Sequence, residues 1–401
     1  MKHLIAVSAL ALAVPAVAQP KTASGSAGGL SWTATNTIVG QTSTGTVATG
    51  GNPIYLARNS QGYSGVVGIL TTYKNGDQFV CSGSLTNNFT VVTAGHCVSD
   101  GRGIPNQDLV RTQVVFANNA ASNADLAIYN PANLNVPGSG VTSIDANFIK
   151  VNPNYTGEVV DQNDIAMIRL SQIAPDYVQR YTIYNGGDLT GADYNIAGYG
   201  TRSVVGGAEG TTGPGAGAGV GRRRQGDNRF DFRWGDSDFG GFFTDRDANG
   251  ENIFGKADVA FGFVADFDNG LAANDASCVL AAAFDLPTSG KYCNLGRGAT
   301  EVSSAGGDSG GPQFINGQLA AVTSYGLVFG NNNLGADFKP GLNNSFGEFA
   351  GYVPTYIHRD FLVNFQAVPE PATWLQMIAG FGLIGGTVRS LRRRKPAAAA
   401  A

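Results

Sequence analysis

The chain has 401 residues, of which 14% are charged and 43% are hydrophobic, and its formal net charge at pH 7 is −4. This hydrophobic fraction excludes a chain that is disordered throughout, and the length suffices for one large domain or two small ones. The 57 glycines, the low charge and the short apolar runs favour an all-β protein that is exported from the cytoplasm.

The first residues, MKHLIAVSALALAVPAVAQP, have the composition of a secretory signal. One lysine precedes an apolar run from Leu4 to Val14, and small residues stand at Ala16 and Ala18. This order predicts a signal peptide over residues 1–18, with cleavage after Ala18. The alternative, a short membrane anchor, is less favoured because the apolar run is too short to span a bilayer comfortably.

Residues 19–52 contain mainly Ser, Thr, Gly and Ala, which predicts a leader, a linker or a removable pro-segment. From about residue 53 the chain contains short runs of β-branched and aromatic residues, typical of a barrel or sandwich rather than a parallel α/β sheet. The first set is SGVVGILTTY (64–73), QFVCSGSL (78–85), FTVVTAGHCV (89–98), VRTQVVFA (110–117) and NDIAMIRL (163–170). The second set is YNIAGYG (194–200), FDFRW (230–234), VAFGFVADF (259–267), PQFI (312–315), LAAVTSYGLV (319–328) and FGEFAGYV (346–353).

Two segments depart from this strand pattern. Residues 204–222 are a low-complexity Gly/Ala stretch, and with residues 235–258 they predict a Gly-rich insertion over about 204–258. Residues 353–365 carry apolar side chains at helical spacing, which predicts a terminal amphipathic helix. We expect His358 to lie on the polar face of that helix.

The C-terminal segment, residues 367–401, combines three features in a fixed order. A Pro-Glu-Pro motif at 369–371 precedes an uncharged apolar stretch over 372–388, which is just long enough for a transmembrane helix. Four arginines and a lysine between 389 and 395 would stay on the cytoplasmic side. This order resembles the PEP-CTERM sorting signal of Gram-negative bacteria, which an exosortase-type membrane enzyme processes. The resemblance implies an inner-membrane-anchored precursor and then a surface or extracellular protein; a plain membrane tail anchor is the alternative.

The chain between the two terminal segments is more acidic than the whole. It has 20 basic and 29 acidic residues, a net charge near −9. A general nucleic-acid-binding surface is therefore not expected. The one basic cluster inside, GRRRQ at 221–225, predicts a solvated strand end.

The four cysteines form two close pairs along the chain. Cys81 and Cys97 are 16 residues apart, and Cys278 and Cys293 are 15 residues apart. An even number of cysteines in an exported chain indicates two disulfides. The tighter Cys-x-x-Cys spacing of zinc sites is absent from the sequence.

Three residues have the chemistry of a base, an orienting acid and a nucleophile. His96 ends a β-forming run in VVTAGHC, and Asp164 begins the run NDIAMIRL, where a buried carboxylate can accept the Nδ1 proton of an imidazole. Ser309 lies in SSAGGDSGGP. A serine nucleophile needs an oxyanion hole of backbone N–H groups, its own and that of Gly307, and the flanking glycines permit the required turn.

These residues, in the order His96, Asp164 and Ser309, resemble the catalytic residues of chymotrypsin-like (trypsin-like, S1) serine proteases. The motifs TAGHC, NDIAMI and GGDSGGP carry the resemblance, which extends over about residues 53–362. AGYG at 197–200 resembles the Gly-aromatic-Gly motif that opens the second barrel of this family.

The resemblance implies a fold and two disulfides. A protease domain over 53–366 would contain two six-stranded antiparallel β-barrels, about 53–175 and 176–353, and a C-terminal helix. The implied disulfides are Cys81–Cys97, beside the histidine, and Cys278–Cys293, before the specificity pocket.

The resemblance also implies the reaction and its partners. Ser309 would attack a peptide carbonyl, His96 would accept its proton and pass it to the leaving amine, and Asp164 would fix the histidine tautomer. The N–H groups of Gly307 and Ser309 would hold the oxyanion. This chemistry needs no metal or cofactor, and its substrates are proteins or peptides. The alternative is a catalytically silent protease-fold protein that binds or adheres at the cell surface.

A specificity follows from positions that match the substrate-binding segments of the family. Ser303 stands six residues before Ser309, where the family places the base of its pocket and trypsins carry an acid. Ser324 and Gly326 resemble the segment that pairs with the substrate backbone, and Gly326 and Gly347 would leave the pocket walls open. A pocket without a buried acid favours a large apolar or aromatic side chain before the scissile bond (P1) over Lys or Arg.

In this family the acid before the nucleophile pairs with a newly formed N-terminal ammonium group. Here that acid is Asp308, and we expect it to be satisfied by a processed N-terminus near residues 38–54. TIVGQ at 37–41 and Ile54 are the candidate sites, although neither follows a basic residue. Ala305 replaces a cysteine that many family members carry, so one pocket disulfide is missing.

Two acidic segments resemble parts of calcium sites. DRDANGEN offers Asp245, Asp247 and Asn249 as the first ligands of a calcium loop. Lys256 stands at the twelfth position, where the closing glutamate is needed, so a solvated turn is the favoured interpretation. DFDNG at 266–270 is a weaker candidate still.

Overall fold

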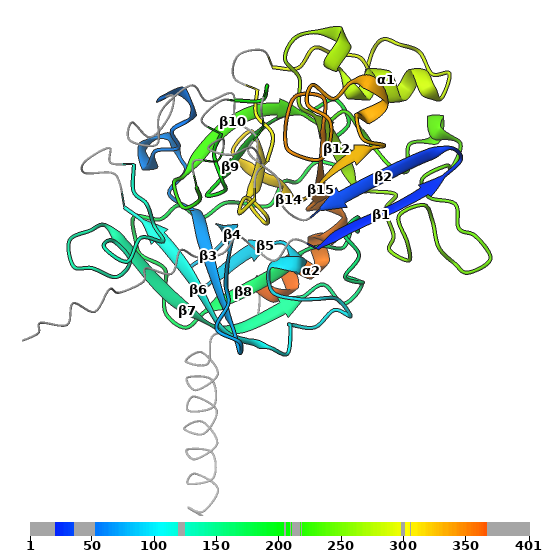
Figure 1. The fold of residues 1–401 in the computed structure, drawn as a ribbon. Helices are drawn as coiled ribbons and strands as arrows, with labels where there is room; N and C mark the ends of the chain where they lie inside the picture. Colours follow the sequence, from blue (N-terminus) through cyan, green and yellow to red (C-terminus); the bar gives the residue numbers. More distant parts are fainter. Residues whose placement is uncertain are drawn as a thin grey trace, which may run out of the picture. The chain divides into compact units, whose positions relative to one another are not determined.

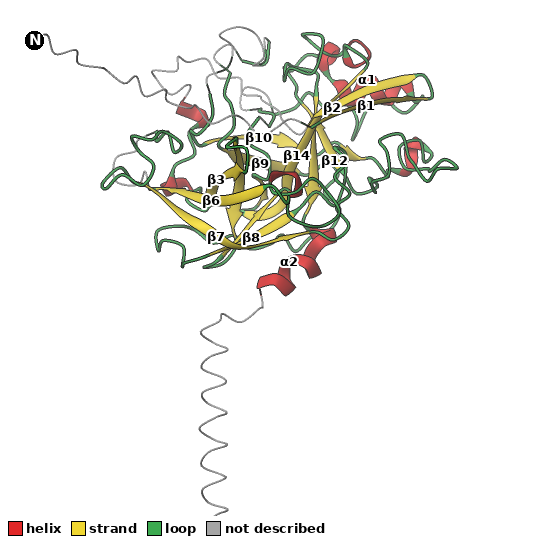
Figure 2. Cartoon of the chain, turned by 60° about the horizontal axis from the view of Figure 1, so that its bottom comes forward, coloured by secondary structure: helices red, strands yellow, loops and turns green. Residues whose placement is uncertain are grey.

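The structure, a computed structural model, describes residues 21–35, 53–118, 125–203, 206–208, 210, 217, 219–297, 301–304 and 306–366. The chain divides into two compact units, Met1–Arg359 and Asp360–Ala401. The predicted signal peptide and sorting tail lie outside the described residues. Within the described residues, strands and loops dominate (Figure 2), and no helix has the length and apolar character needed to cross a bilayer.

Six strands of the first half form a closed antiparallel barrel, as predicted (Figure 1). They follow one another around the barrel in the order β3-β4-β5-β8-β7-β6. Apolar side chains fill the interior; Ile69 of β3 and Val114 of β6, for example, are ladder partners and are fully buried. The strands are β3 (Val66–Tyr73), β4 (Gln78–Leu85), β5 (Thr90–Thr93), β6 (Leu109–Ala117), β7 (Val141–Val151) and β8 (Ala166–Leu170).

The later strands form an open sheet that curls on itself, so the prediction of a second closed six-stranded barrel was wrong for the described residues. The main path of this sheet is β10-β9-β13-β14-β15-β12-β11. Its two end strands, β10 and β11, are consecutive in the sequence, with only Phe230 and Asp231 between them. The Phe230 N–H donates to Ala192 beside β9, whereas the Asp231 N–H donates to Val264 of β12. The two end strands, β10 and β11, are therefore connected along the chain, but in the described residues no hydrogen-bonded ladder joins them.

The strands of this sheet have the following bounds: β9 (Asp193–Gly198), β10 (Arg224–Arg229), β11 (Phe232–Arg233), β12 (Phe263–Asp266), β13 (Pro312–Ile315), β14 (Gln318–Phe329) and β15 (Phe349–Pro354).

Part of the predicted leader belongs to the same sheet. β1 (Thr22–Ala27) and β2 (Leu30–Thr35) form an antiparallel hairpin, and β2 pairs antiparallel with residues 326–329 of β14. Trp32 anchors the hairpin, because it is 4% exposed and its Nε1–H donates to the Ile253 carbonyl (3.0 Å). The prediction of a leader, linker or removable pro-segment over 19–52 did not anticipate this hairpin.

The predicted insertion at about 204–258 was too broad, since it contains β10, β11 and part of the core. The indole Nε1–H of Trp234 donates to the Tyr325 hydroxyl (2.7 Å), which ties the segment to β14. The buried aromatic residues that this segment supplies to the core are Phe230, Phe232, Trp234, Phe239, Phe243 and Phe254.

Two α-helices occur in the described residues. α1 (Ala276–Ala283) begins at Asp275, whose carboxylate accepts the Cys278 N–H (2.8 Å). α2 (Arg359–Gln366) begins later than the predicted helix at 353–365, because β15 runs to Pro354 and a 3-10 turn follows. The short 3-10 turns are η2 (Pro53–Tyr55), η3 (Asn59–Gln61), η4 (Gly95–Cys97), η5 (Ser237–Phe239), η6 (Ala272–Asn274), η8 (Asn333–Gly335) and η9 (Tyr356–His358).

The basic cluster GRRRQ is not a solvated strand end. Arg223 and Arg224 are each 4% exposed. Arg224 forms a bidentate ion pair with Asp125 (2.8 and 2.7 Å), and Arg223 Nε donates to the Ala57 carbonyl (2.9 Å). Burial opposes ionisation of Asp125, but the hydrogen bond and charge of Arg224 hold its pKa below the usual value. Both arginines are therefore buried inside the fold and connect its segments through hydrogen bonds and an ion pair.

His358 is buried, contrary to the expectation of a place on a polar helix face. Its Nε2 lies 2.8 Å from the Gln162 carbonyl oxygen, and its Nδ1 lies 3.0 Å from the Asn152 side-chain nitrogen. Nε2 therefore carries the proton and Nδ1 accepts, which describes a neutral ring. Burial lowers the pKa of His358 to about 4.

We expect His358 to make the stability of the fold pH-dependent in the acid range. Its folded pKa of about 4 lies below the ordinary value of 6.5, so the unfolded chain binds more protons between these values. Stability should therefore fall by roughly 3 kcal/mol as the pH falls through this window. Unfolding free energies of the wild type and of His358→Gln, measured from pH 7 to pH 4, should converge; a constant difference would contradict the assignment.

Candidate active site

Two hydrogen bonds hold His96 against Asp164. The turn that carries His96 follows β5, and Asp164 immediately precedes β8, the neighbour of β5 in the barrel. One carboxylate oxygen accepts the His96 backbone N–H (2.7 Å), and the other lies 2.7 Å from Nδ1. The side chain of Asp164 is fully buried, and that of His96 is 7% exposed. Because a carboxylate only accepts, Nδ1 carries the proton and Nε2 of the neutral ring keeps its lone pair.

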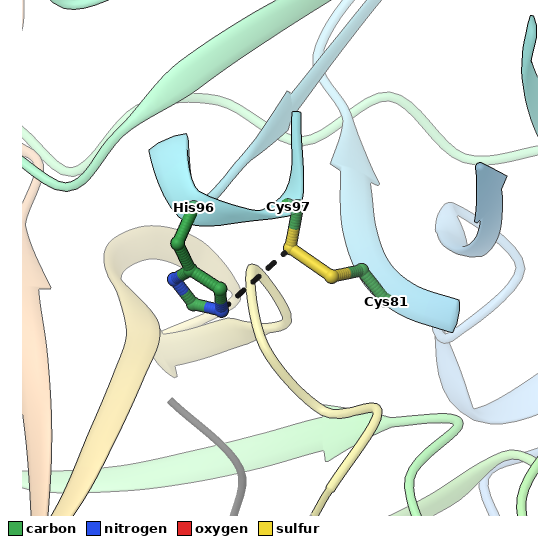
Figure 3. Close-up of side chains that lie close together, drawn as sticks. All are labelled: Cys81, His96 and Cys97. Atoms are coloured by element: carbon green, nitrogen blue, oxygen red, sulfur yellow. Dashed lines mark hydrogen bonds between the residues drawn. A yellow bond between two sulfur atoms is a disulfide. The ribbon is translucent and has the colours of Figure 1, made fainter. Parts of the chain in front are cut away.

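The Cys81–Cys97 disulfide fastens the histidine turn to β4 (Figure 3). Cys97 Sγ lies 4.0 Å from His96 Nε2, along the dashed line in the figure. Because the two sulfurs are bonded to each other, they offer no thiolate, and this group of side chains is not a metal site. The structure also contains the Cys278–Cys293 disulfide, which fastens α1 to the segment after it.

The loop that carries Ser309 lies beside the same disulfide. The Ser309 carbonyl oxygen accepts the Ser82 N–H (2.8 Å) and lies 3.6 Å from Cys97 Sγ. The next residue, Gly310, donates its N–H to the Thr323 carbonyl of β14 (2.8 Å). The loop is thus held between β4 of the barrel and β14 of the sheet, next to the turn that carries the histidine.

The backbone of this loop turns sharply at Gly307. Gly307 has φ +99°, in the region that favours glycine, and its carbonyl accepts the Ser82 hydroxyl (2.8 Å). Within the described part of the chain, no acceptor takes the Gly307 N–H. That donor is available to a ligand. Ser309 is 2% exposed.

The carboxylate of Asp308 faces the Gly-aromatic-Gly motif. Its carboxylate accepts the Gly200 N–H (2.7 Å), and a methyl group added at Gly198 would come within 2.0 Å of it. Ile54 lies in the η2 turn and is 48% exposed, while residues 36–52 lie outside the described residues. The partnership of Asp308 with a processed N-terminus stays a prediction.

The predicted substrate-binding residues have different surroundings. Ser303 is buried at 6% exposure, and Gly326 in β14 pairs with Thr35 of the N-terminal hairpin. A methyl group at Gly347 would lie 2.2 Å from the Ala336 carbonyl oxygen, so backbone packing alone requires glycine there. The role of these residues in specificity stays a prediction.

Two residues of the site carry roles that the sequence did not indicate. Ser324, expected only to pair with substrate, donates its hydroxyl to Asp164 (2.6 Å). Ser82, which is fully buried, donates to Gly307 and accepts the Tyr199 N–H (2.9 Å). A small serine inside a strand run has no periodic or spacing signal, so only the tertiary structure identifies these bonds.

Replacing Ser324 by alanine should weaken the orientation of Asp164 without removing it. Asp164 keeps both bonds from His96, so we expect kcat of peptide hydrolysis to fall by about tenfold, the effect of one lost hydrogen bond to a charged group. Steady-state kinetics on a single-residue ester substrate, which needs little backbone pairing, isolates this effect. An unchanged kcat would contradict the role of the bond.

The acidic turn at Asp245–Asn249, the weak calcium candidate, is closed by its own hydrogen bonds. The Asp247 carboxylate accepts the backbone N–H groups of Asn249 (2.8 Å) and Glu251 (3.0 Å), so it closes its own exposed turn. Asp245 and Asp247 belong to none of the clusters of three or more metal-capable side chains in the described residues.

Comparison with known families locates a similarity in the first part of the chain. No curated protein matches the chain. The family model described as Trypsin matches residues 56–213. This segment contains β3 to β9, His96 and Asp164, and it ends before Ser309. Residues 56–213 are therefore similar to trypsin-family domains in the part that holds the histidine and the aspartate.

Proposed function

We propose that this chain is a serine endopeptidase of the trypsin family, with His96, Asp164 and Ser309 as its catalytic residues. The observation that carries the proposal is the pair of hydrogen bonds from His96 to Asp164, which holds the proton on Nδ1 and leaves Nε2 for a nucleophile. The similarity of residues 56–213 to trypsin-family domains supports the same activity.

The mechanism follows from these groups. Ser309 Oγ attacks the carbonyl carbon of the scissile bond while His96 Nε2 takes the hydroxyl proton, and Asp164 stabilises the imidazolium. The N–H groups of Gly307 and Ser309 bind the oxyanion, each contributing about 3 kcal/mol. The C–N bond then breaks as Nε2–H protonates the leaving amine. Water, activated by the same Nε2, hydrolyses the acyl-enzyme and restores Ser309.

The proposed substrates are proteins or peptides with a large apolar or aromatic P1 residue. Ser303, at the position of the pocket base, brings no charge to hold Lys or Arg. A peptide library that varies P1 tests both the activity and the preference. We expect the fastest cleavage after Phe, Tyr or Leu; preferred cleavage after Lys or Arg would contradict the proposed pocket, and no cleavage of any peptide would contradict the activity.

We also propose that the protein is exported from a Gram-negative cell. Residues 1–18 direct export, and residues 367–401 anchor the precursor in the inner membrane until an exosortase-type enzyme processes it. The masses of the protein from cells with and without the processing enzyme test this. A C-terminus that is intact in both would contradict processing.

Activation, in this proposal, forms a new N-terminus near residues 38–54 whose ammonium group pairs with Asp308. N-terminal sequencing of the active enzyme tests it directly. An active enzyme that begins at Gln19 would contradict it.

A further inference from the structure

Five buried carboxylates lie in one region of the curled sheet, apart from the catalytic groups. They come from the bend between β10 and β11, from β12 and the residues after it, from the cap of α1, and from the segment before Ser303. None is more than 2% exposed. The five are Asp231, Asp266, Asp268, Asp275 and Glu301.

Three of these carboxylates converge on one point. Ligand oxygens of Asp266, Asp268 and Asp275 all lie within 4.8 Å of one another. In the described residues, no Lys or Arg forms an ion pair with any of the three. Burying several like charges without a cation costs far more free energy than a fold normally tolerates.

Two of the five carboxylates, those of Asp231 and Glu301, accept hydrogen bonds that fix the surrounding backbone. Asp231 accepts from the Ser277 hydroxyl (2.8 Å) and the Asp266 N–H (2.9 Å), and Glu301 accepts the Asp268 N–H (2.5 Å). These two carboxylates hold the backbone of the loop in place.

The side chain of Asp268 is the exception in this network. Neither of its oxygens has a hydrogen-bond partner, although the residue is only 2% exposed. It lies among the converging oxygens of Asp266 and Asp275. A buried carboxylate with both oxygens unused, facing two others, indicates a missing positive charge.

We propose that Asp266, Asp268 and Asp275 bind a calcium ion. Oxygen ligands of Ca²⁺ lie about 2.3–2.6 Å from the ion, so opposite ligands are up to about 5 Å apart, which the observed spread fits. Zn²⁺ would use nitrogen or thiolate ligands, and the nearby Cys278 and Cys293 are joined in a disulfide. The ion would tie β12 and the residues after it to the residue that caps α1.

The test follows thermal unfolding of the full chain, stripped of metal with EGTA, before and after Ca²⁺ is added. We expect Ca²⁺ at about 100 times its Kd to raise the Tm of the wild type by roughly 5 °C. Asp268→Asn removes a carboxylate ligand and should lose most of the calcium-induced rise. The matched control Asp247→Asn, at the exposed turn, should keep the full rise.

Either of two results would overturn the site: no calcium-induced rise in the wild type, or a full rise that survives Asp268→Asn. Should Asp268→Asn not fold, calorimetric titration of the metal-free wild type and of Asp247→Asn decides. One bound Ca²⁺ per chain in both supports the site, and no binding overturns it.

A second, independent observation concerns one edge of β14. Along this edge, β13 pairs with residues 318–322, the Ser309 loop bonds to Thr323, and β2 pairs with residues 326–329. The other edge of β14 pairs with β15. β2 runs antiparallel to β14, so its C-terminal end at Thr35 points along the strand toward Thr323 and the Ser309 loop.

We infer that β2 occupies the edge on which an extended substrate would lie before its scissile bond; this inference rests on the proposed function. A substrate strand that adds to a sheet edge must have a polarity that delivers its carbonyl to Ser309, and β2 has this polarity. Substrates with several residues before the scissile bond must therefore displace β2, whereas short substrates need not.

Thr33→Pro removes a backbone N–H from β2, and Thr33→Val keeps it, which makes the two variants a matched pair. For a peptide with five residues before the scissile bond, we expect Thr33→Pro to raise kcat/KM about tenfold, the effect of one or two lost backbone bonds. For a single-residue ester we expect no change. Should Thr33→Pro not fold, Trp32→Leu loosens the same strand through its anchor.

Labelling with a fluorophosphonate distinguishes failure of the proposed function from failure of the proposed role of β2, because this small probe needs no strand pairing. If neither the wild type nor Thr33→Pro is labelled, the proposed function fails. If both are labelled and the long substrate is cleaved equally fast by both, the role of β2 is overturned.

Discussion

Replacing Ser309 by alanine is expected to lower kcat for peptide hydrolysis by about 10⁶-fold. The substitution removes the nucleophile, so no acyl-enzyme can form. Binding and the Gly307 N–H remain, and they leave a residual rate above that of water. Hydrolysis of a chromogenic peptide with an aromatic P1 residue measures the loss.

The matched control is Ser99→Ala, a buried serine in the segment after His96 whose hydroxyl accepts the Gly101 N–H (3.0 Å). Its kcat should stay within a few-fold of the wild type. If Ser309→Ala and Ser99→Ala lost activity equally, the loss would reflect disturbed structure and not chemistry.

Replacing Asp164 by asparagine is expected to lower kcat by about 10⁴-fold. Asp164 accepts from the His96 N–H, from Nδ1 and from the Ser324 hydroxyl. The asparagine amide accepts hydrogen bonds only at its oxygen, and its nitrogen is a donor. The imidazole therefore takes the wrong tautomer, and Nε2 no longer serves as a base. Single-turnover kinetics measures the chemical step.

The neighbouring Asp161 provides the control for Asp164. It is 1% exposed, and its carboxylate accepts from Thr156 and Asn163 instead of the histidine. Asp161→Asn should lower the Tm while leaving kcat within about tenfold of the wild type. A comparable loss of kcat in both variants would contradict the specific role of Asp164.

The first barrel was predictable because its signals are local. Short β-branched runs, separated by turn residues, mark β3, β4, β5, β6 and β8, whereas β7 was not among the predicted runs. The cysteines beside His96 and in β4 mark the contact that Cys81–Cys97 makes. The juxtaposition of His96 with Asp164 followed from a family resemblance and not from periodicity. Its distances, and the added bond from Ser324, required the structure.

That the second sheet is open was not predictable, because the interruption between β10 and β11 depends on two residues. Phe230 and Asp231 bond to opposite ends of the strand path, and nothing in FDFRW distinguishes that bend from a continuous strand. The pairing of β2 with β14 joins segments almost 300 residues apart in the chain. The Ser, Thr, Gly and Ala composition of residues 19–52, which contain β2, resembles that of a linker.

The cluster of buried carboxylates was also not predictable from the sequence. Asp266 and Asp268 lie in DFDNG, which the sequence presents as a weak turn motif, and DRDANGEN resembles a calcium loop more closely. Our proposal reverses this order, because Asp275 and Asp231 reach Asp266 from other segments. Burial, which decides whether a carboxylate needs a cation, is a property of the tertiary fold.

The central claim, that Ser309 is a nucleophile activated by His96, is tested most directly by mapping a covalent adduct. The processed, active wild type is treated with a fluorophosphonate and digested, and the labelled peptide is identified by mass spectrometry. We expect a single adduct on Ser309, formed rapidly in the wild type and absent from His96→Ala under the same conditions. An adduct on another serine, or no adduct on the activated protein, would contradict the account.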